Sequence, residues 1–78
     1  MNSYRPYYTL LACDDLNSPW RIEFGSTYEP DVTFERDDYV EKGYKRAFLR
    51  IITTHDSQAA INERVAYLNK RVAIRAGS

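Results

Sequence analysis

The chain has 78 residues, of which 44% are hydrophobic and 14% aromatic, and its 11 Lys and Arg residues balance 11 Asp and Glu residues. Chains this short rarely form more than one domain, and the apolar content and balanced charge exclude a disordered chain. We therefore expect one domain over residues 1–78, with an ordered core at about 7–73 and flexible ends at 1–5 and 75–78.

The first two elements are predicted to be strands. Residues 7–13 form a short apolar run rich in β-prone side chains. In residues 20–24 apolar and charged side chains alternate, which is typical of a strand with one face on the core. The core side chains expected from this alternation are Trp20, Ile22 and Phe24, with Arg21 and Glu23 facing solvent.

A helix is predicted at about residues 30–42. Pro30 suits the first turn of a helix, and the acidic residues around it favour the positive end of the helix dipole. Gly43 suits the position just after the last helical residue. The apolar stripe of this helix is thin and consists of Val32, Tyr39 and Val40.

Residues 46–53 predict a third strand, which is apolar on both faces. A second helix is predicted at about 57–73, with Thr54, Asp56 or Ser57 as its cap. Its apolar residues repeat at i, i+4, i+7 and i+11, as Ile61, Val65, Leu68 and Val72.

The element order β-β-α-β-α predicts a two-layer α+β fold. A crossover through the first helix would place the third strand beside the first, in a three-stranded antiparallel sheet of order 2-1-3. We expect both helices on one face and the other face open, and an open apolar face is typical of an interface. Alternatively, the loop at 14–19, an N-terminal arm with Tyr4 or a C-terminal segment with Ile74 covers that face.

The open face is the candidate partner-binding site. Both alternate sets of the first strand carry apolar residues, so either Tyr7, Thr9 and Leu11 or Tyr8 and Leu10 would join Phe48 and Ile52 there. We expect these anchors to bind a protein partner or a second copy of the chain, through the face or an edge strand. The candidate partner-binding residues are Tyr7, Tyr8, Phe48, Arg50 and Ile52.

Charge is segregated along the chain. Residues 14–41 hold nine acidic and two basic residues, a net charge of −7, and residues 42–78 hold eight basic and two acidic residues, a net charge of +6. This split predicts an acidic and a basic helix that orient partners. The alternative is two solvated helix faces whose charges contribute little to stability.

No constellation in the sequence favours catalysis. His55 and Asp56 could form a general-base pair, but adjacent side chains seldom converge, and Asp56 is explained as a helix cap. Cys13 lies beside two carboxylates, which raise the pKa of a thiol and weaken the nucleophile. The acidic side chains of 35–41 diverge on a helix. We expect no enzyme activity, no catalytic residue, no metal, no cofactor and no small-molecule substrate.

Cysteine content and hydropathy bear on location. A single cysteine forms no internal disulfide, which favours a reducing, cytoplasmic setting. Residues 1–6 lack the basic and apolar regions of a signal peptide, and no apolar run reaches the ~20 residues that span a bilayer. We therefore expect a cytoplasmic protein with no membrane partner.

Single-stranded nucleic-acid binding is the alternative function. Tyr7, Tyr8 and Phe48 around Arg50 are typical of an aromatic stacking platform. The helix at 57–73 and the residues after it add a basic stripe, formed by Arg64, Lys70, Arg71 and Arg75. The zero net charge and the lack of an RNP-type sequence disfavour this function, because phosphate binding needs a positive footprint.

Two stretches of the sequence carry a resemblance to known proteins. These are Trp20-Arg21-Ile22-Glu23-Phe24-Gly25, followed by the acidic helix ending Asp38-Tyr39, and Gln58-Ala59-Ala60-Ile61 running to Val65-Ala66-Tyr67-Leu68-Asn69. The chain resembles, over most of residues 7–70, small uncharacterised proteins encoded in phage and prophage genomes. The resemblance transfers no catalytic residue. It implies a small accessory protein that acts by stoichiometric binding to a host or phage protein, as anti-CRISPR and other host-takeover proteins do.

Overall fold

The computed structural model describes residues 5–76, and the expectations for 1–4 and 77–78, such as a covering arm with Tyr4, lie outside the described residues. The elements are β1 (Pro6–Ala12), β2 (Arg21–Ser26), α1 (Glu29–Glu41), the short 3-10 turn η1 (Arg46–Phe48), β3 (Leu49–His55) and α2 (Gln58–Ala76). The predicted element order and the antiparallel sheet of order β2-β1-β3 are confirmed, and the fold is α+β.

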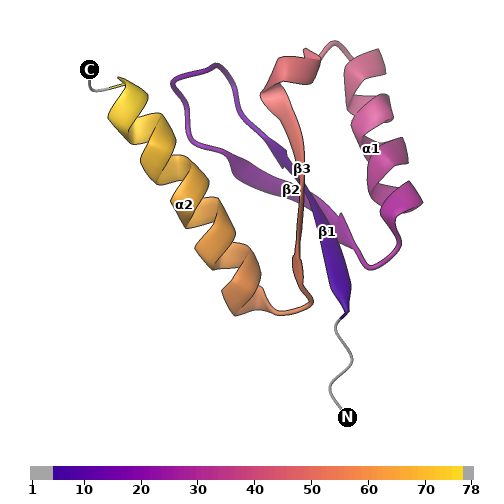
Figure 1. Cartoon of the computed structure of the whole chain (residues 1–78). Coiled ribbons are helices and arrows are strands. Elements are labelled where there is room, and N and C mark those ends of the chain that lie inside the picture. Colours follow the sequence, from indigo (N-terminus) through magenta and orange to yellow (C-terminus); the bar gives the residue numbers. More distant parts are fainter. Residues whose placement is uncertain (1–4, 77–78) are drawn as a thin grey trace.

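The two helices lie on opposite faces of the sheet, so the expectation that both cover one face is wrong (Figure 1). The core on the α1 side is formed by Leu10, Ala12, Val32 and Leu49. The core on the α2 side is formed by Leu11, Ile52 and Leu68, with Trp20 and Val65 packed against it. The architecture therefore has three layers, and α2 covers the face that was expected to be open.

The composition of β1 explains why a helix covers the second face of the sheet. Leu10 and Leu11 point to opposite faces, because successive residues of a strand alternate, and both are 0% exposed. Burying a Leu or Ile side chain stabilises a fold by about 1.5–3 kcal/mol. Leaving Leu11 and Ile52 in water would therefore remove much of the marginal stability of a small domain. A strand that is apolar on both faces indicates a layer on each side.

A β-bulge in β2 changes which side chains reach the core. Leu10 pairs with Phe24 and Leu11 pairs with Ile22, so Glu23 is the extra residue. The alternation predicted for residues 20–24 is therefore wrong: Phe24 packs on the α1 side and Trp20 on the α2 side. Glu23 shares the α1 side, where its Oε1 accepts a 2.7 Å hydrogen bond from the Tyr39 hydroxyl.

Local signals set the end of α1 and the start of α2 as predicted, whereas α2 continues to Ala76, past its predicted end at about residue 73. Gly43 has a φ of 110°, and its N–H donates to the Val40 carbonyl at 3.1 Å, while the Tyr44 N–H donates to the Tyr39 carbonyl at 3.0 Å. These two bonds form a Schellman motif, closed by the Tyr39 and Tyr44 rings at 5.1 Å. At the start of α2, the Ser57 hydroxyl accepts a 3.1 Å hydrogen bond from the Ala60 N–H, so Ser57 is the cap.

One amide side chain anchors the middle of α2. The backbone N–H of Trp20 donates to Asn69 Oδ1 at 2.6 Å, and Asn69 Nδ2 donates to the backbone carbonyl of Trp20 at 3.2 Å. Asn69 thereby satisfies both backbone groups of a residue that precedes β2. This pair of bonds fixes α2 against the sheet and sets its position relative to β3.

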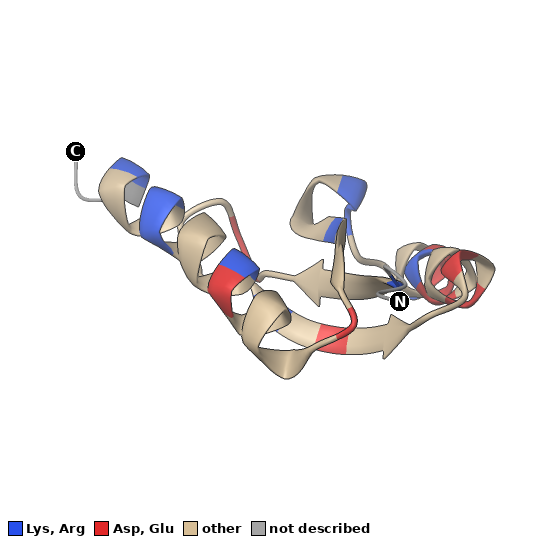
Figure 2. Ribbon diagram, turned by 60° about the horizontal axis from the view of Figure 1, so that its bottom comes forward, with Lys and Arg blue, Asp and Glu red and all other residues tan. Residues whose placement is uncertain are grey.

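The charge segregation along the sequence becomes a segregation between layers. Figure 2 shows acidic residues gathered on α1 and basic residues along α2. α1 carries six acidic residues and one basic residue, and α2 carries four basic residues and one acidic residue. Because the sheet separates the helices, the molecule has an acidic and a basic side.

Candidate functional site

The five candidate partner-binding residues do not form one surface. Tyr8 packs on the α1 side, whereas Ile52 is 4% exposed beneath α2. Tyr7 lies across Gly25, where an added Cβ would come within 2.5 Å of its hydroxyl oxygen. Phe48 lies in η1 and only Arg50 is exposed. The structure therefore does not bring these five residues together on one open face, because a helix covers each side of the sheet.

The outer edge of β3 carries unpaired backbone groups. The Cys13 N–H donates to the Phe48 carbonyl at 3.0 Å, and the Asp56 N–H donates to the Arg5 carbonyl at 3.1 Å. Hydrogen-bonded pairs recur at every second residue of an antiparallel ladder. In the observed register, Arg50, Ile52 and Thr54 therefore direct their N–H and C=O groups to β1. The intervening Ile51 and Thr53 direct theirs outward, where no strand among residues 5–76 pairs with them.

A second stripe of α2 lies beside this edge. It consists of Ala60, Arg64, Tyr67 and Arg71, which precede the four core residues of α2 by one position each. The Arg64 guanidinium lies 5.7 Å from the centroid of the Tyr67 ring, and the Arg71 guanidinium lies 6.0 Å from it. Both guanidinium groups thus lie within cation–π distance of the ring, and the three exposed side chains form one wall.

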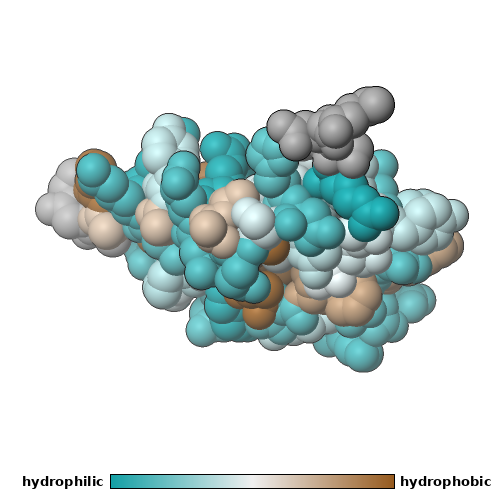
Figure 3. All heavy atoms as spheres, turned by 90° about the horizontal axis from the view of Figure 1, so that it is seen from below, coloured by the Kyte–Doolittle hydropathy of each residue, from teal (hydrophilic) through white to brown (hydrophobic). Residues whose placement is uncertain are grey.

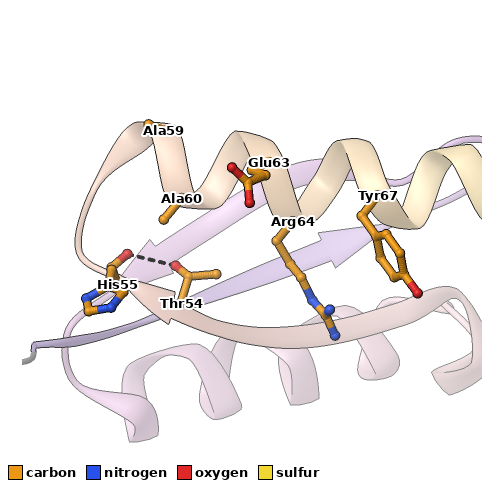
Figure 4. Close-up of a pocket in the computed structure, with 7 residues that line it drawn as sticks. All are labelled: Thr54, His55, Ala59, Ala60, Glu63, Arg64 and Tyr67. Carbon is orange, nitrogen blue, oxygen red and sulfur yellow. Dashed lines mark hydrogen bonds between the residues drawn. The ribbon is translucent and has the colours of Figure 1, made fainter.

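We call the space between the wall and β3 the groove. At its α2 N-terminal end is a hollow of about 630 Å³, the Ala60 hollow, lined by Thr54, His55, Ala59, Ala60, Glu63, Arg64 and Tyr67. Figure 4 shows Arg64 and Tyr67 extending from α2 toward β3, and Thr54 extending from β3 toward α2. Small side chains at Ala59 and Ala60 leave the space open. A free strand edge beside a hollow and an ordered wall suits the binding of an extended chain.

The opposite edge of the sheet is occupied by a polar cluster. Arg21 forms ion pairs with Asp14 and Glu23, both at 2.9 Å, and Tyr39 donates to Glu23. The hydrogen bond to Glu23, followed by burial, raises the pKa of Tyr39 to about 12. The Tyr44 hydroxyl accepts a further 3.3 Å bond from Arg21. These bonds tie β2 to α1 and to the loop after β1.

Among the residues considered for catalysis, Asp56 is not the cap of α2, a role that Ser57 fills, and the pair His55–Asp56 adjoins a bonded Thr54 hydroxyl. The Thr54 hydroxyl donates to the main-chain carbonyl of His55 at 2.8 Å, so it belongs to the turn before α2. Cys13 is 2% exposed, and burial, then Asp15, raises the pKa of its thiol. Over residues 5–76, no group of three or more His, Cys, Asp or Glu side chains is placed to hold a metal ion.

Exposed hydrophobic side chains are scattered. Figure 3, which views the molecule from below, shows a mainly hydrophilic surface with small hydrophobic areas. The most exposed large side chains are Phe34, Ile74, Tyr28 and Leu16. No helix in the described part of the chain is long and apolar enough to cross a membrane. On the face seen in Figure 3, recognition through a large apolar patch is therefore not favoured.

Sequence reasoning missed the groove because it divided α2 into an apolar stripe and a basic stripe, and did not single out the helix face next to the core. The signal was present: Ala60, Arg64, Tyr67 and Arg71 repeat with the same spacing as the core residues. That spacing identifies a second helix face, rotated by one residue, next to the buried face. Which strand lies beside it depends on the side of the sheet that α2 covers.

No family model, curated protein or solved structure matches this chain. The resemblance to phage-encoded proteins stays a prediction.

Proposed function

We propose that this chain is a small, non-catalytic protein-interaction module that binds an extended segment of another protein by strand addition to β3. The observation that carries the proposal is the outward-directed backbone of Ile51 and Thr53 beside the groove. An added strand would form hydrogen bonds with these groups, and the groove would receive its alternate side chains. This mode fits the stoichiometric binding that the resemblance to phage-encoded accessory proteins implies.

The wall of the groove supplies suitable anchors. Tyr and Arg are enriched among the residues that dominate binding energy. Tyr67 is 51% exposed, and its ring lies within cation–π distance of Arg64 and Arg71. Side chains that are ordered before binding lose less conformational entropy on contact. The wall therefore supports affinity as well as orientation.

The positive charge of the wall favours a different protein, rather than a second copy of this chain, as the partner that binds β3. Antiparallel pairing of two β3 edges would place both α2 helices on the same face of a six-stranded sheet. The basic walls of the two copies would then approach each other, and like charges across an interface are unfavourable. An acidic or neutral segment meets no such repulsion.

The test uses Thr53→Pro, which removes the outward N–H and leaves the bonds to β1 intact. Linear peptides selected from a displayed random library against the wild-type protein are expected to bind Thr53→Pro at least about tenfold more weakly, a loss of about 1.4 kcal/mol. Thr53→Val keeps the N–H and the branched side chain, and is expected to bind them as the wild type does. Circular dichroism checks that all three proteins are folded.

Equal affinity of folded Thr53→Pro and wild type for these peptides contradicts strand addition at β3. Light scattering over a range of concentrations tests self-association, and a wild-type dimer that Thr53→Pro dissociates would make the occupant a second copy. A single-stranded oligonucleotide that outcompetes the peptides, with steep salt dependence, would favour the nucleic-acid alternative.

A further inference from the structure

At the α2 C-terminal end of the groove, three arginines converge on one hollow. Arg50 from β3 and Arg71 and Arg75 from α2 line a space of about 220 Å³, together with Trp20 and apolar side chains. We call it the arginine hollow. Among residues 5–76, no acidic side chain lines it, whereas the Ala60 hollow at the other end includes Glu63. The groove therefore has one strongly cationic end.

These cations differ from those on the α1 side. Arg21, Arg36, Lys42 and Arg46 each form an ion pair with an Asp or Glu side chain. Arg50 and Arg71 form none with any residue of 5–76, and Arg75 donates to the Leu16 carbonyl at 3.2 Å. Arg50 and Arg71, two like charges that form no ion pair with residues 5–76, create a local potential that favours an anion.

We propose that the arginine hollow binds a carboxylate of the segment that adds to β3. Guanidinium groups bind carboxylates through paired, charge-assisted hydrogen bonds. Leu68 and Val72 form apolar walls, which strengthen such bonds by excluding water. The proposal rests on the proposed function and gives the added strand a direction, because its acidic residue must lie at the arginine end.

A protein carboxylate fits better than a nucleic-acid phosphate. The hollow is small, and its Arg50 is the neighbour in β3 of Ile51, whose N–H and C=O groups point outward and suit a peptide backbone. The chain has zero net charge, and the acidic α1 would repel a long polyanion. The carboxylate can come from an Asp or Glu side chain or from the C-terminus of a chain, and the two sources are separable by experiment.

The only tryptophan of the chain lines this hollow, so its fluorescence reports on binding there. The probes are acetyl-glutamate methylamide for a side-chain carboxylate and acetyl-alanine for a terminal one. Their neutral matches are acetyl-glutamine methylamide and acetyl-alanine methylamide, all at one ionic strength. We expect a saturable change in Trp20 emission with at least one acidic probe and none with the neutral probes.

Arg71→Gln is expected to weaken binding of the acidic probe by about tenfold, since a charged hydrogen-bond partner is lost. Arg50→Gln is a second variant in case the first perturbs α2. Lys70→Gln removes the same charge from the neighbouring residue, which does not line the hollow, and should change affinity little. Equal responses to acidic and neutral probes, or equal losses in Arg71→Gln and Lys70→Gln, would overturn the proposal. So would short oligothymidine that binds Trp20 more tightly than every carboxylate.

Thr53→Pro separates this proposal from the proposed function. The variant leaves the arginine hollow intact and is expected to keep the fluorescence response. Thr53→Pro could keep the Trp20 fluorescence response and also bind the library peptides as tightly as the wild type does. This result would contradict strand addition and leave the carboxylate site supported. Alternatively, Thr53→Pro could lose peptide binding while wild-type Trp20 fluorescence responds to no carboxylate. This result would contradict the carboxylate site and leave strand addition supported.

Discussion

The two edges of the sheet are built in opposite ways. The edge at β2 carries a bulge, and its Arg21 and Glu23 are tied to Asp14 and Tyr39. The edge at β3 is a regular strand of seven residues, without proline or lysine, beside a groove. Bulges and charges protect edge strands from pairing with other chains. One edge of the sheet is thus closed by local structure, and the other is left able to pair with another chain.

The largest effect expected from this contrast is on stability. Thr54→Pro removes an N–H that points to β1, and we expect a loss of about 2–3 kcal/mol in the free energy of unfolding. Thr53→Pro removes an outward N–H and should cost under about 1 kcal/mol. Urea denaturation measures both. Similar losses in the two variants would show that the outward assignment of the β3 backbone is wrong.

The wall beside β3 depends on the Asn69 anchor. Asn69→Ala removes both hydrogen bonds to the Trp20 backbone and should cost about 2 kcal/mol, since each bond contributes about 1 kcal/mol. Asn69→Asp keeps an acceptor for the Trp20 N–H and should lose less. Thermal unfolding followed by Trp20 fluorescence compares the two. An unchanged midpoint in Asn69→Ala would mean that α2 is held by its apolar face alone.

A change at Tyr39 tests the edge at β2, where Tyr39 bonds to Glu23. Tyr39→Phe removes the bond to Glu23 and should cost about 1 kcal/mol near neutral pH. Because the pKa of Tyr39 is raised from 10.0 to about 12, the stability from its bond is fully present below pH 10 and is lost as the pH rises through about 12. Unfolding measured from pH 8 to pH 12 should therefore bring wild type and variant together at the alkaline end. A constant difference over that range would argue against the bond.

The smallest expected effect is in the central strand, β1, which pairs with both edge strands. The Thr9 hydroxyl is buried and has no hydrogen-bond partner among the described residues. Thr9→Val replaces it with a methyl group of similar size, and we expect a gain of up to about 1 kcal/mol. In a domain of this size that gain raises the unfolding midpoint by about 4–8 °C. Peptide binding at β3 should not change, which makes this variant a control for effects of stability alone.

Much of the fold was predictable because its signals are local. The spacing of Ile61, Val65, Leu68 and Val72 located α2, and Gly43 located the end of α1. The strand order followed from the element order and the usual crossover. The orientation of residues 20–24 was not predictable in the same way, because the bulge at Glu23 depends on pairing with β1.

The candidate site shows the same division. The sequence by itself determined the elements, the apolar stripes, the acidic and basic helices and the adjacent stripe of Ala60, Arg64, Tyr67 and Arg71. Only the tertiary structure decided that α2 covers the second face of the sheet and that this stripe lies along the free edge of β3. The physical reason is that a strand pattern shows which residues need cover, whereas the packing of distant segments decides which helix provides it.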